Sequence, residues 1–219
     1  MRKKSLCLAA TVLAGGILAA SAQVYSLNVV GYVNTPIKGN GAFTLLANPL
    51  VAATNDTVSL VGNLLPNKSQ VLTWSGSAYV TASKISGVWN TNLPIPAGTG
   101  FFVKNGPAGS PDLTNTFVGE VLGGIPGTNT TALPAGFALV GSKSPIGGTL
   151  TSVGDGTLNL GGVLPNKSQV LIWDNSGSGA YVTASKISGV WNTNLQLNVG
   201  QGFFVKAFAA TNWTQVLTN

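Results

Sequence analysis

The chain of 219 residues contains no histidine, one cysteine and one methionine. Cys7, Met1 and the only arginine, Arg2, all lie within its first seven residues. The rest of the chain therefore has no histidine or cysteine to bind zinc or copper, and no histidine to act as the base for a nucleophilic serine. With a single cysteine, no disulfide can form within the chain. We therefore expect no metal and no cofactor, and a protein that is not an enzyme. Buried apolar area must supply the stability.

Acidic residues are also few. The chain has five: Asp56, Asp112, Glu120, Asp155 and Asp174. A calcium site needs several clustered oxygen ligands, and glycoside hydrolysis needs a pair of carboxylates. No such pair recurs along the chain. Asp56 and Asp155 each precede a Leu-Pro-Asn turn by nine residues, and this position favours a helix cap or an Asx turn over a lone calcium ligand.

The N-terminus has the pattern of a signal peptide. Arg2, Lys3 and Lys4 precede an apolar run over residues 6–20, and Ala20-Ser21-Ala22 is typical of a cleavage site. We predict a signal peptide over residues 1–22; the alternative is an uncleaved anchor. A membrane span needs roughly 20 apolar residues, and no such run follows. We therefore expect a mature chain without a transmembrane segment that is secreted, extracellular or at the cell surface, or periplasmic.

Positive charge in the mature chain is sparse and scattered. Eight lysines stand against five acids, for a net charge of about +3. The lysines occur singly, without a basic run and without an arginine fork for phosphate. Nucleic acid is therefore not an expected partner.

An unbroken repeat organises the rest of the chain. The fifteen residues Tyr79–Leu93 (YVTASKISGVWNTNL) recur unchanged as Tyr181–Leu195, and we call them the doubled block. Leu65–Leu72 (LPNKSQVL) recurs as Leu164–Leu171. Four residues precede Tyr79 after Trp74, whereas seven precede Tyr181 after Trp173, and this length change indicates a hairpin loop. We predict two units, residues 23–115 and residues 116–219.

Short β-rich stretches separated by Gly, Pro and Asn fill both units. They predict an all-β chain: two tandem antiparallel β-sandwich or barrel-like repeats of about 90 residues after the signal peptide. Asp56–Leu65 is predicted as one short helix or a strand. Val30–Val33 and Val118–Val121 share a V-G-x-V pattern, so we expect that strand to open each unit and to close the one before it. Trp213–Leu217 would then close the last unit.

Matched aromatic residues are the best candidates for ligand binding. An exposed indole can stack on a sugar ring while neighbouring amides bind its hydroxyls. The candidate ligand-binding residues are Trp89, Asn90, Asn92, Trp191, Asn192 and Asn194. The alternative is that these tryptophans fill small cores, which we favour for Trp74 and Trp173 in their apolar strands. A Ser83-Lys84 catalytic pair is disfavoured, because neighbours on a strand point to opposite faces.

Two further motifs carry a resemblance. They are the start Gln23–Asn34 (QVYSLNVVGYVN) and the repeated G-x-G-F-F-V-K of Gly98–Lys104 and Gly200–Lys206. Together they resemble a family of uncharacterised secreted bacterial proteins with two β-repeat units. The resemblance implies an extracellular β-sandwich of structural or adhesive use, without known site residues. We thus expect a secreted, non-catalytic structural or adhesive surface protein. Its partner would be itself or a cell-envelope polysaccharide; the alternative is a carbohydrate-binding module.

Overall fold

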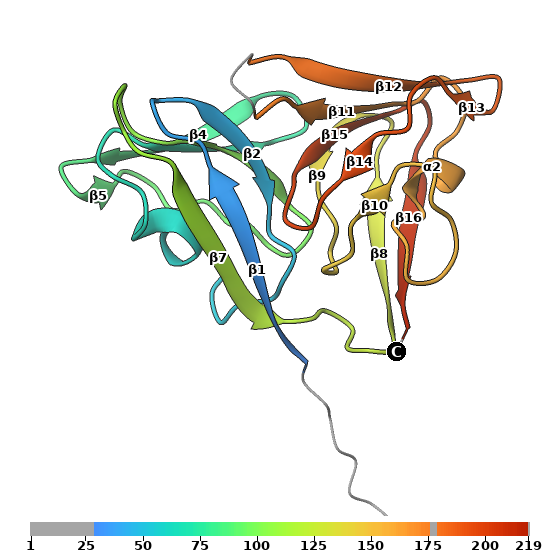
Figure 1. The fold of residues 1–219 in the computed structure, drawn as a ribbon, viewed down its shortest axis with the longest axis horizontal. Coiled ribbons are helices and arrows are strands. Elements are labelled where there is room, and N and C mark those ends of the chain that lie inside the picture. Colours follow the sequence, from blue (N-terminus) through green and yellow to red (C-terminus); the bar gives the residue numbers. More distant parts are fainter. Residues whose placement is uncertain (1–28, 176–178, 219) are drawn as a thin grey trace, which may run out of the picture.

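The computed structural model describes residues 29–175 and 179–218. Its regular secondary structure is nearly all antiparallel strand, arranged in two similar halves (Figure 1). The predicted all-β class with two similar repeats is confirmed. The predicted signal peptide, residues 1–22, lies outside the described residues. Within the described ranges, no helix has the length and apolar character that crossing a membrane would require.

A five-stranded antiparallel sheet forms the base of the first half. Its strands, in spatial order, are β2 (Phe43–Ala47), β6 (Gly100–Lys104), β3 (Gln70–Trp74), β4 (Tyr79–Ile85) and β5 (Val88–Trp89). The hairpin between β4 and β5 turns on Ser86 and Gly87, whose φ angles are 50° and 86°. Positive φ at both central residues is what a tight two-residue hairpin requires.

The second half repeats this sheet. Its strands, in spatial order, are β9 (Gly136–Val140), β15 (Phe203–Ala207), β11 (Gln169–Trp173), β12 (Tyr181–Ile187) and β13 (Val190–Trp191). The register is the same in both halves, because Trp74 lies opposite Tyr79 and Trp173 lies opposite Tyr181. The longer loop before Tyr181 therefore leaves the strand pairing unchanged.

A long two-stranded ribbon completes each half. β1 (Val30–Ile37) pairs with β7 (Leu113–Glu120), and β8 (Gly127–Leu133) pairs with β16 (Thr211–Leu217). The expectation that Val118–Val121 closes the first unit is confirmed, because Gly119 pairs with Gly31, but the segment does not open the second unit, which begins with β8. Closure of the last unit by Trp213–Leu217 is confirmed. The division expected between residues 115 and 116 falls inside β7.

A short helical segment precedes β3 in the first half and β11 in the second. The first half has a π-helical turn, η1 (Val58–Gly62), within the segment predicted as a helix or a strand, and the second has α2 (Leu160–Val163). Asp56 Oδ1 accepts a hydrogen bond from Ser59 N at 2.8 Å, as expected of a residue that precedes a helix. The second half also has a small ribbon of β10 (Gly148–Thr149) and β14 (Gln196–Leu197).

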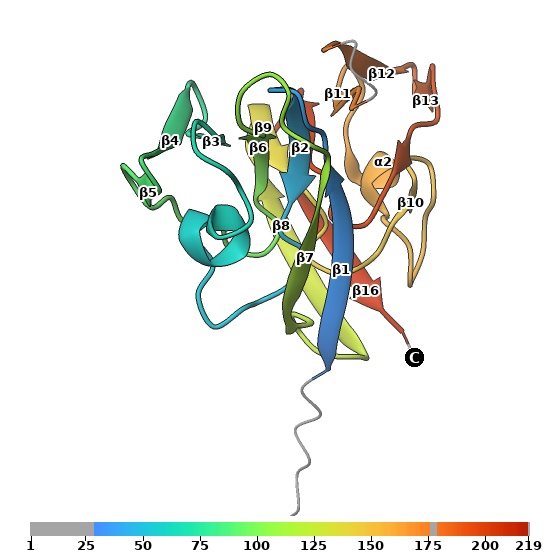
Figure 2. The same cartoon turned by 60° about the vertical axis from the view of Figure 1, so that its left-hand side comes forward.

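Side chains alternate between two buried environments along each sheet, as the strand period of two dictates. Val71 and Phe101 face the interior of the first half, whereas their neighbours Leu72 and Phe102 face the second half. Leu217 of β16 packs into the core of the first half, so the halves share apolar contacts. The two ribbons lie centrally, between β4 on one side and β12 on the other (Figure 2).

Candidate functional site

The tryptophans predicted to bind a ligand lie at the outer end of each sheet. Trp89 and Trp191 are half-buried against the cores of their own halves. Trp89 Nε1 donates to the carbonyl of Gly62 at 3.4 Å, and Trp191 Nε1 donates to that of Gly161 at 3.2 Å. Each indole N–H is therefore directed to the helical segment of its own half. This is the arrangement of a packing side chain that satisfies its polar atom.

The four predicted asparagines are exposed, yet each uses its side-chain carbonyl to bind its own chain. The backbone donors are Ser83 N to Asn90 (2.8 Å), Ser185 N to Asn192 (2.8 Å), Val58 N to Asn92 (3.0 Å) and Thr151 N to Asn194 (3.1 Å). The structure thus places the six candidates in two matched groups, one in each half. These contacts hold the hairpin in both groups, and they also bind Val58 of η1 in the first half and Thr151, which follows β10, in the second.

Lys84 and Lys186 of the doubled block also bind their own chain. Lys84 Nζ donates to the carbonyls of Gly62 and Leu65 at 2.7 and 2.8 Å. Lys186 Nζ makes the matching bonds in the second half, at 2.9 and 2.7 Å. Each ammonium group therefore lies against main-chain carbonyl oxygens, on the opposite face of the strand from Ser83 or Ser185.

Eight aromatic side chains line the contact between the halves, and we call them the aromatic seam. They are Phe43, Trp74, Tyr79 and Phe102 of the first half and Phe137, Trp173, Tyr181 and Phe204 of the second. Most of the ring contacts have a counterpart in the other half. Trp74 meets Phe204 edge to face at 5.6 Å between ring centroids, and Trp173 meets Phe102 at 5.3 Å. Such pairs add to the stability that buried area provides.

Indole hydrogen bonds across the seam are reciprocal as well. Trp74 Nε1 donates to the carbonyl of Phe137 at 3.3 Å, and Trp173 Nε1 donates to that of Phe43 at 3.0 Å. The two halves are therefore related by an approximate two-fold axis. The sequence predicts Trp74 and Trp173 as packing residues but does not reveal that each reaches the other half. The only sign of that contact in the sequence is that the same aromatic residues recur at matching positions in both halves.

Tyr79 and Tyr181 meet close to this approximate axis. Their hydroxyl oxygens are 3.5 Å apart. Burial raises the pKa of the Tyr181 phenol above its ordinary value, and the hydrogen bond with Tyr79 raises it further. The doubled block thus supplies both the centre of the seam and, at its other end, an exposed hairpin.

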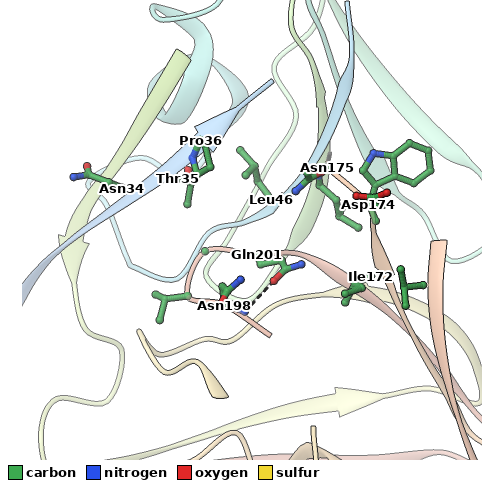
Figure 3. Close-up of a pocket in the computed structure, with 14 residues that line it drawn as sticks. Asn34, Thr35, Pro36, Leu46, Ile172, Asp174, Asn175, Asn198 and Gln201 are labelled. Atoms are coloured by element: carbon green, nitrogen blue, oxygen red, sulfur yellow. Dashed lines mark hydrogen bonds between the residues drawn. The ribbon is translucent and has the colours of Figure 1, made fainter. Parts of the chain in front are cut away.

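A cleft of about 550 Å³ opens beside the seam, between the halves (Figure 3). Asn198 and Gln201 lie together on one side of it, where Gln201 Oε1 accepts a bond from Asn198 N at 2.9 Å. Asn175 lies on the other side and accepts a bond from Leu45 N at 3.3 Å. Apolar side chains, including Trp173 and Leu46, line the rest. Amides above an apolar floor suit a polar ligand of small size.

Each sheet has one edge covered by the opposite half. In the first sheet that edge is β2, where Ala47 N donates to the carbonyl of Gly200 at 2.8 Å. In the second sheet it is β9, where Gly141 N donates to the carbonyl of Gly98 at 3.0 Å. Gly98 and Gly200 belong to the repeated G-x-G-F-F-V-K motif, so this motif joins the halves at both places.

The other edge of each sheet lies in the doubled block. β5 covers only the end of β4, and β13 covers only the end of β12. We call the uncovered stretches Tyr79–Ala82 and Tyr181–Ala184 the open edges. Exposed apolar side chains accompany them: Val80 (45%), Ile85 (62%) and Val88 (69%), matched by Val182 (44%), Ile187 (63%) and Val190 (70%). The same apolar surface is thus presented twice.

The described ranges contain no place where three or more His, Cys, Asp or Glu side chains gather. Lys38 and Asp112 form an exposed ion pair at 3.0 Å. Comparison of the chain with protein-family models, with curated proteins and with solved structures finds no match. The function therefore has to be argued from the geometry above.

Proposed function

We propose that the chain is a secreted, non-catalytic structural or adhesive protein of the cell surface. The observation that carries the proposal is the apolar surface of the doubled block, presented once by each half and almost equally exposed in both. Two matched surfaces on one chain let two weak contacts act together, which raises the overall affinity without any new contact. Exposed apolar residues that cluster in this way are typical of interaction surfaces.

The side chains of the doubled block support a binding role over a catalytic one. Lys84 and Lys186 are engaged by main-chain carbonyls, and Trp89 and Trp191 bind the backbone of their own halves. None of these groups is arranged as a nucleophile with an adjacent base. The N-terminal residues 1–22 support export on sequence grounds.

Binding to isolated bacterial cell envelopes tests the proposal. We expect the chain over residues 23–219 to sediment with the envelopes, and the variant Ile85→Ser/Ile187→Ser to lose most of this binding. Val153→Ser is the matched control, because Val153 is 65% exposed but lies outside the doubled block. Envelopes that retain the double variant as well as the wild type would contradict the proposal, and so would turnover of a substrate by the purified chain.

Carbohydrate binding is a second candidate, favoured by the cleft between the halves. Its amides Asn175, Asn198 and Gln201 and the nearby Trp173 are the kinds of side chain that bind a sugar ring. On a glycan array we expect Asn198→Ala/Gln201→Ala to remove any signal. The variant Trp89→Ala/Trp191→Ala separates this site from the one predicted by sequence. Loss of the signal in that variant alone, with the fold intact, would place the sugar on the tryptophans.

A further inference from the structure

The open edges carry main-chain groups that point away from their sheets. In β4, Lys84 N donates toward β3, to the carbonyl of Ser69 at 2.9 Å, whereas Ser83 N donates away from it, to Asn90 Oδ1 at 2.8 Å. Because the direction of the main-chain N–H and C=O groups alternates along an antiparallel strand, those of Thr81 and Tyr79 also point away from β3. Neither lies opposite a residue of β5, which pairs only with Lys84 and Ile85.

The second half repeats this geometry in β12. Lys186 N donates to the carbonyl of Ser168 at 2.9 Å, and Ser185 N donates to Asn192 Oδ1 at 2.8 Å. The main-chain N–H and C=O groups of Thr183 and Tyr181 therefore point away from β11. Each half thus ends in the same uncovered strand with the same sequence.

Within the part of the chain that the structure describes, neither stretch has the usual protections of an edge strand. Natural edges are blunted by charged side chains that point outward or inward, by proline, by a bulge or by a covering segment. The stretch Tyr79–Ser83 has no charge, proline or glycine, and its register with β3 is continuous. The nearest lysine, Lys84, lies beyond this stretch, where the strand is paired with Trp89 of β5. The opposite edge of the same sheet, β2, is covered by the other half.

We propose that the open edges pair with the open edges of further copies of this chain, strand against antiparallel strand, with Val80 or Val182 at the centre of each junction. This inference rests on the structural role proposed above. The edge is complementary to itself. When two copies align about Val80, Thr81 of one lies opposite Tyr79 of the other, and these outward-pointing residues exchange about four main-chain hydrogen bonds.

Side chains favour the same register. The two Val80 side chains, each half-exposed in the single chain, face each other across the junction. The tyrosine of one copy lies beside the threonine of the other, and aromatic and β-branched cross-strand pairs stabilise a sheet. The identity of the doubled block makes Val182 equivalent to Val80, so junctions form between any two edges.

Each chain carries two such edges, and they extend toward opposite sides of the molecule (Figure 2). Pairing at one edge leaves the other free, so association is open-ended instead of stopping at a dimer. A junction of one short strand is small compared with a stable interface, so the chains associate measurably only at high concentration.

Sedimentation velocity of residues 23–219 over a wide concentration range tests the inference. We expect the wild type to form species of growing mass. Thr81→Lys alone and Thr183→Lys alone should each stop at a dimer, because one edge remains, and the double variant should stay a monomer. Val153→Lys is the matched control: it adds the same charge at an exposed position outside the doubled block and should behave as the wild type.

Val80→Thr/Val182→Thr provides a second test that does not depend on the lysine variants folding. Threonine has nearly the shape of valine and suits an exposed strand, so circular dichroism should be unchanged while association weakens. A wild type that stays monomeric throughout, or a folded double lysine variant that still assembles, would overturn the inference. Envelope binding by a strictly monomeric wild type would leave the proposed function standing while edge pairing fails.

Discussion

Each half has its own copy of the same five-stranded sheet and of the doubled block. The halves differ in the two-stranded ribbon that packs beneath that sheet. In the first half, the ribbon of β1 and β7 buries Val33, Ile37 and Phe117 together with the polar Thr35 and Asn115. In the second, Asn129 and Gln215 are buried in the ribbon of β8 and β16. A sheet of the same order and register therefore forms over two ribbons with different buried side chains. The contacts that recur in both halves are those made within the sheets.

Hydrogen bonds explain why the polar interior is tolerated. Gln215 Nε2 donates to Ser142 Oγ at 2.8 Å, and Asn129 Nδ2 donates to Ser144 Oγ at 2.8 Å. In the first ribbon, by contrast, Asn115 Nδ2 is buried and has no hydrogen-bond partner among the described residues. A buried amide costs free energy only where it is left unpaired. The first ribbon is thus the one with a buried polar group that lacks a partner among the described residues.

Truncation of the largest ribbon side chains should have the largest effect. Phe117 and Trp213 are almost completely buried and contact the rings of Phe101 and Phe203. We expect Phe117→Ala and Trp213→Ala each to lower the free energy of unfolding by about 3–5 kcal/mol. Urea denaturation followed by tryptophan fluorescence or circular dichroism measures this. Because Leu217 joins the first core, each variant should unfold in one transition, and two separate transitions would show that the halves are independent.

Removal of the half-buried lysine ammonium group of the doubled block should affect both halves equally. Lys84→Met and Lys186→Met each delete two hydrogen bonds to main-chain carbonyls but keep the length of the side chain. We expect each to lower the free energy of unfolding by about 1.5–3 kcal/mol. Lys68→Met, in the turn before β3, is a control for the loss of charge. A large difference between the two main variants would break the equivalence of the halves.

Replacement of a buried amide side chain by leucine should change the free energy of unfolding in opposite directions in the two ribbons. Gln215→Leu leaves Ser142 Oγ without this partner and should lower the free energy of unfolding by about 1–3 kcal/mol. Asn115→Leu removes a buried unpaired amide and should raise it by about 1 kcal/mol. Chemical denaturation of the two variants side by side provides the comparison. Destabilisation by both to the same degree would refute the contrast drawn between the ribbons.

The smallest expected effect concerns the tyrosines of the seam. The pKa of Tyr181 is raised in the folded chain, first by burial and then by Tyr79. Below about pH 10, the ordinary tyrosine value, the phenol is neutral in the folded and unfolded states and costs nothing. At higher pH only the unfolded state ionises, so the folded state loses stability. The fall of the melting temperature above pH 10 should therefore be shallower in Tyr181→Phe than in the wild type.

The sequence predicts the local elements well because their causes are local. The doubled block and the alternation of β-rich stretches predict the strands, and Asp56 precedes a helical segment as expected. The core role favoured for Trp74 and Trp173 also agrees with their positions in the aromatic seam.

Partners that are distant along the chain could not be predicted. Trp173 binds the carbonyl of Phe43, 130 residues away, and no local pattern encodes that register. For the same reason the V-G-x-V segment at Val118 was expected to open the second half as well as to close the first, whereas it pairs only with β1 of the first half. The burial of the Trp89 and Trp191 side chains could not be predicted either. Each lies on a strand of two residues, which is too short for the alternation of apolar and polar residues to show which face is buried.

Amide hydrogen exchange at the open edges tests the central claim most directly. In dilute solution the amides of Thr81 and Thr183 should exchange quickly, because they point away from their sheets, while those of Ala82 and Ala184 are protected. At high concentration Thr81 and Thr183 should become protected as chains pair. Protection of these two amides in dilute solution, or exchange that does not change with concentration, would contradict the account.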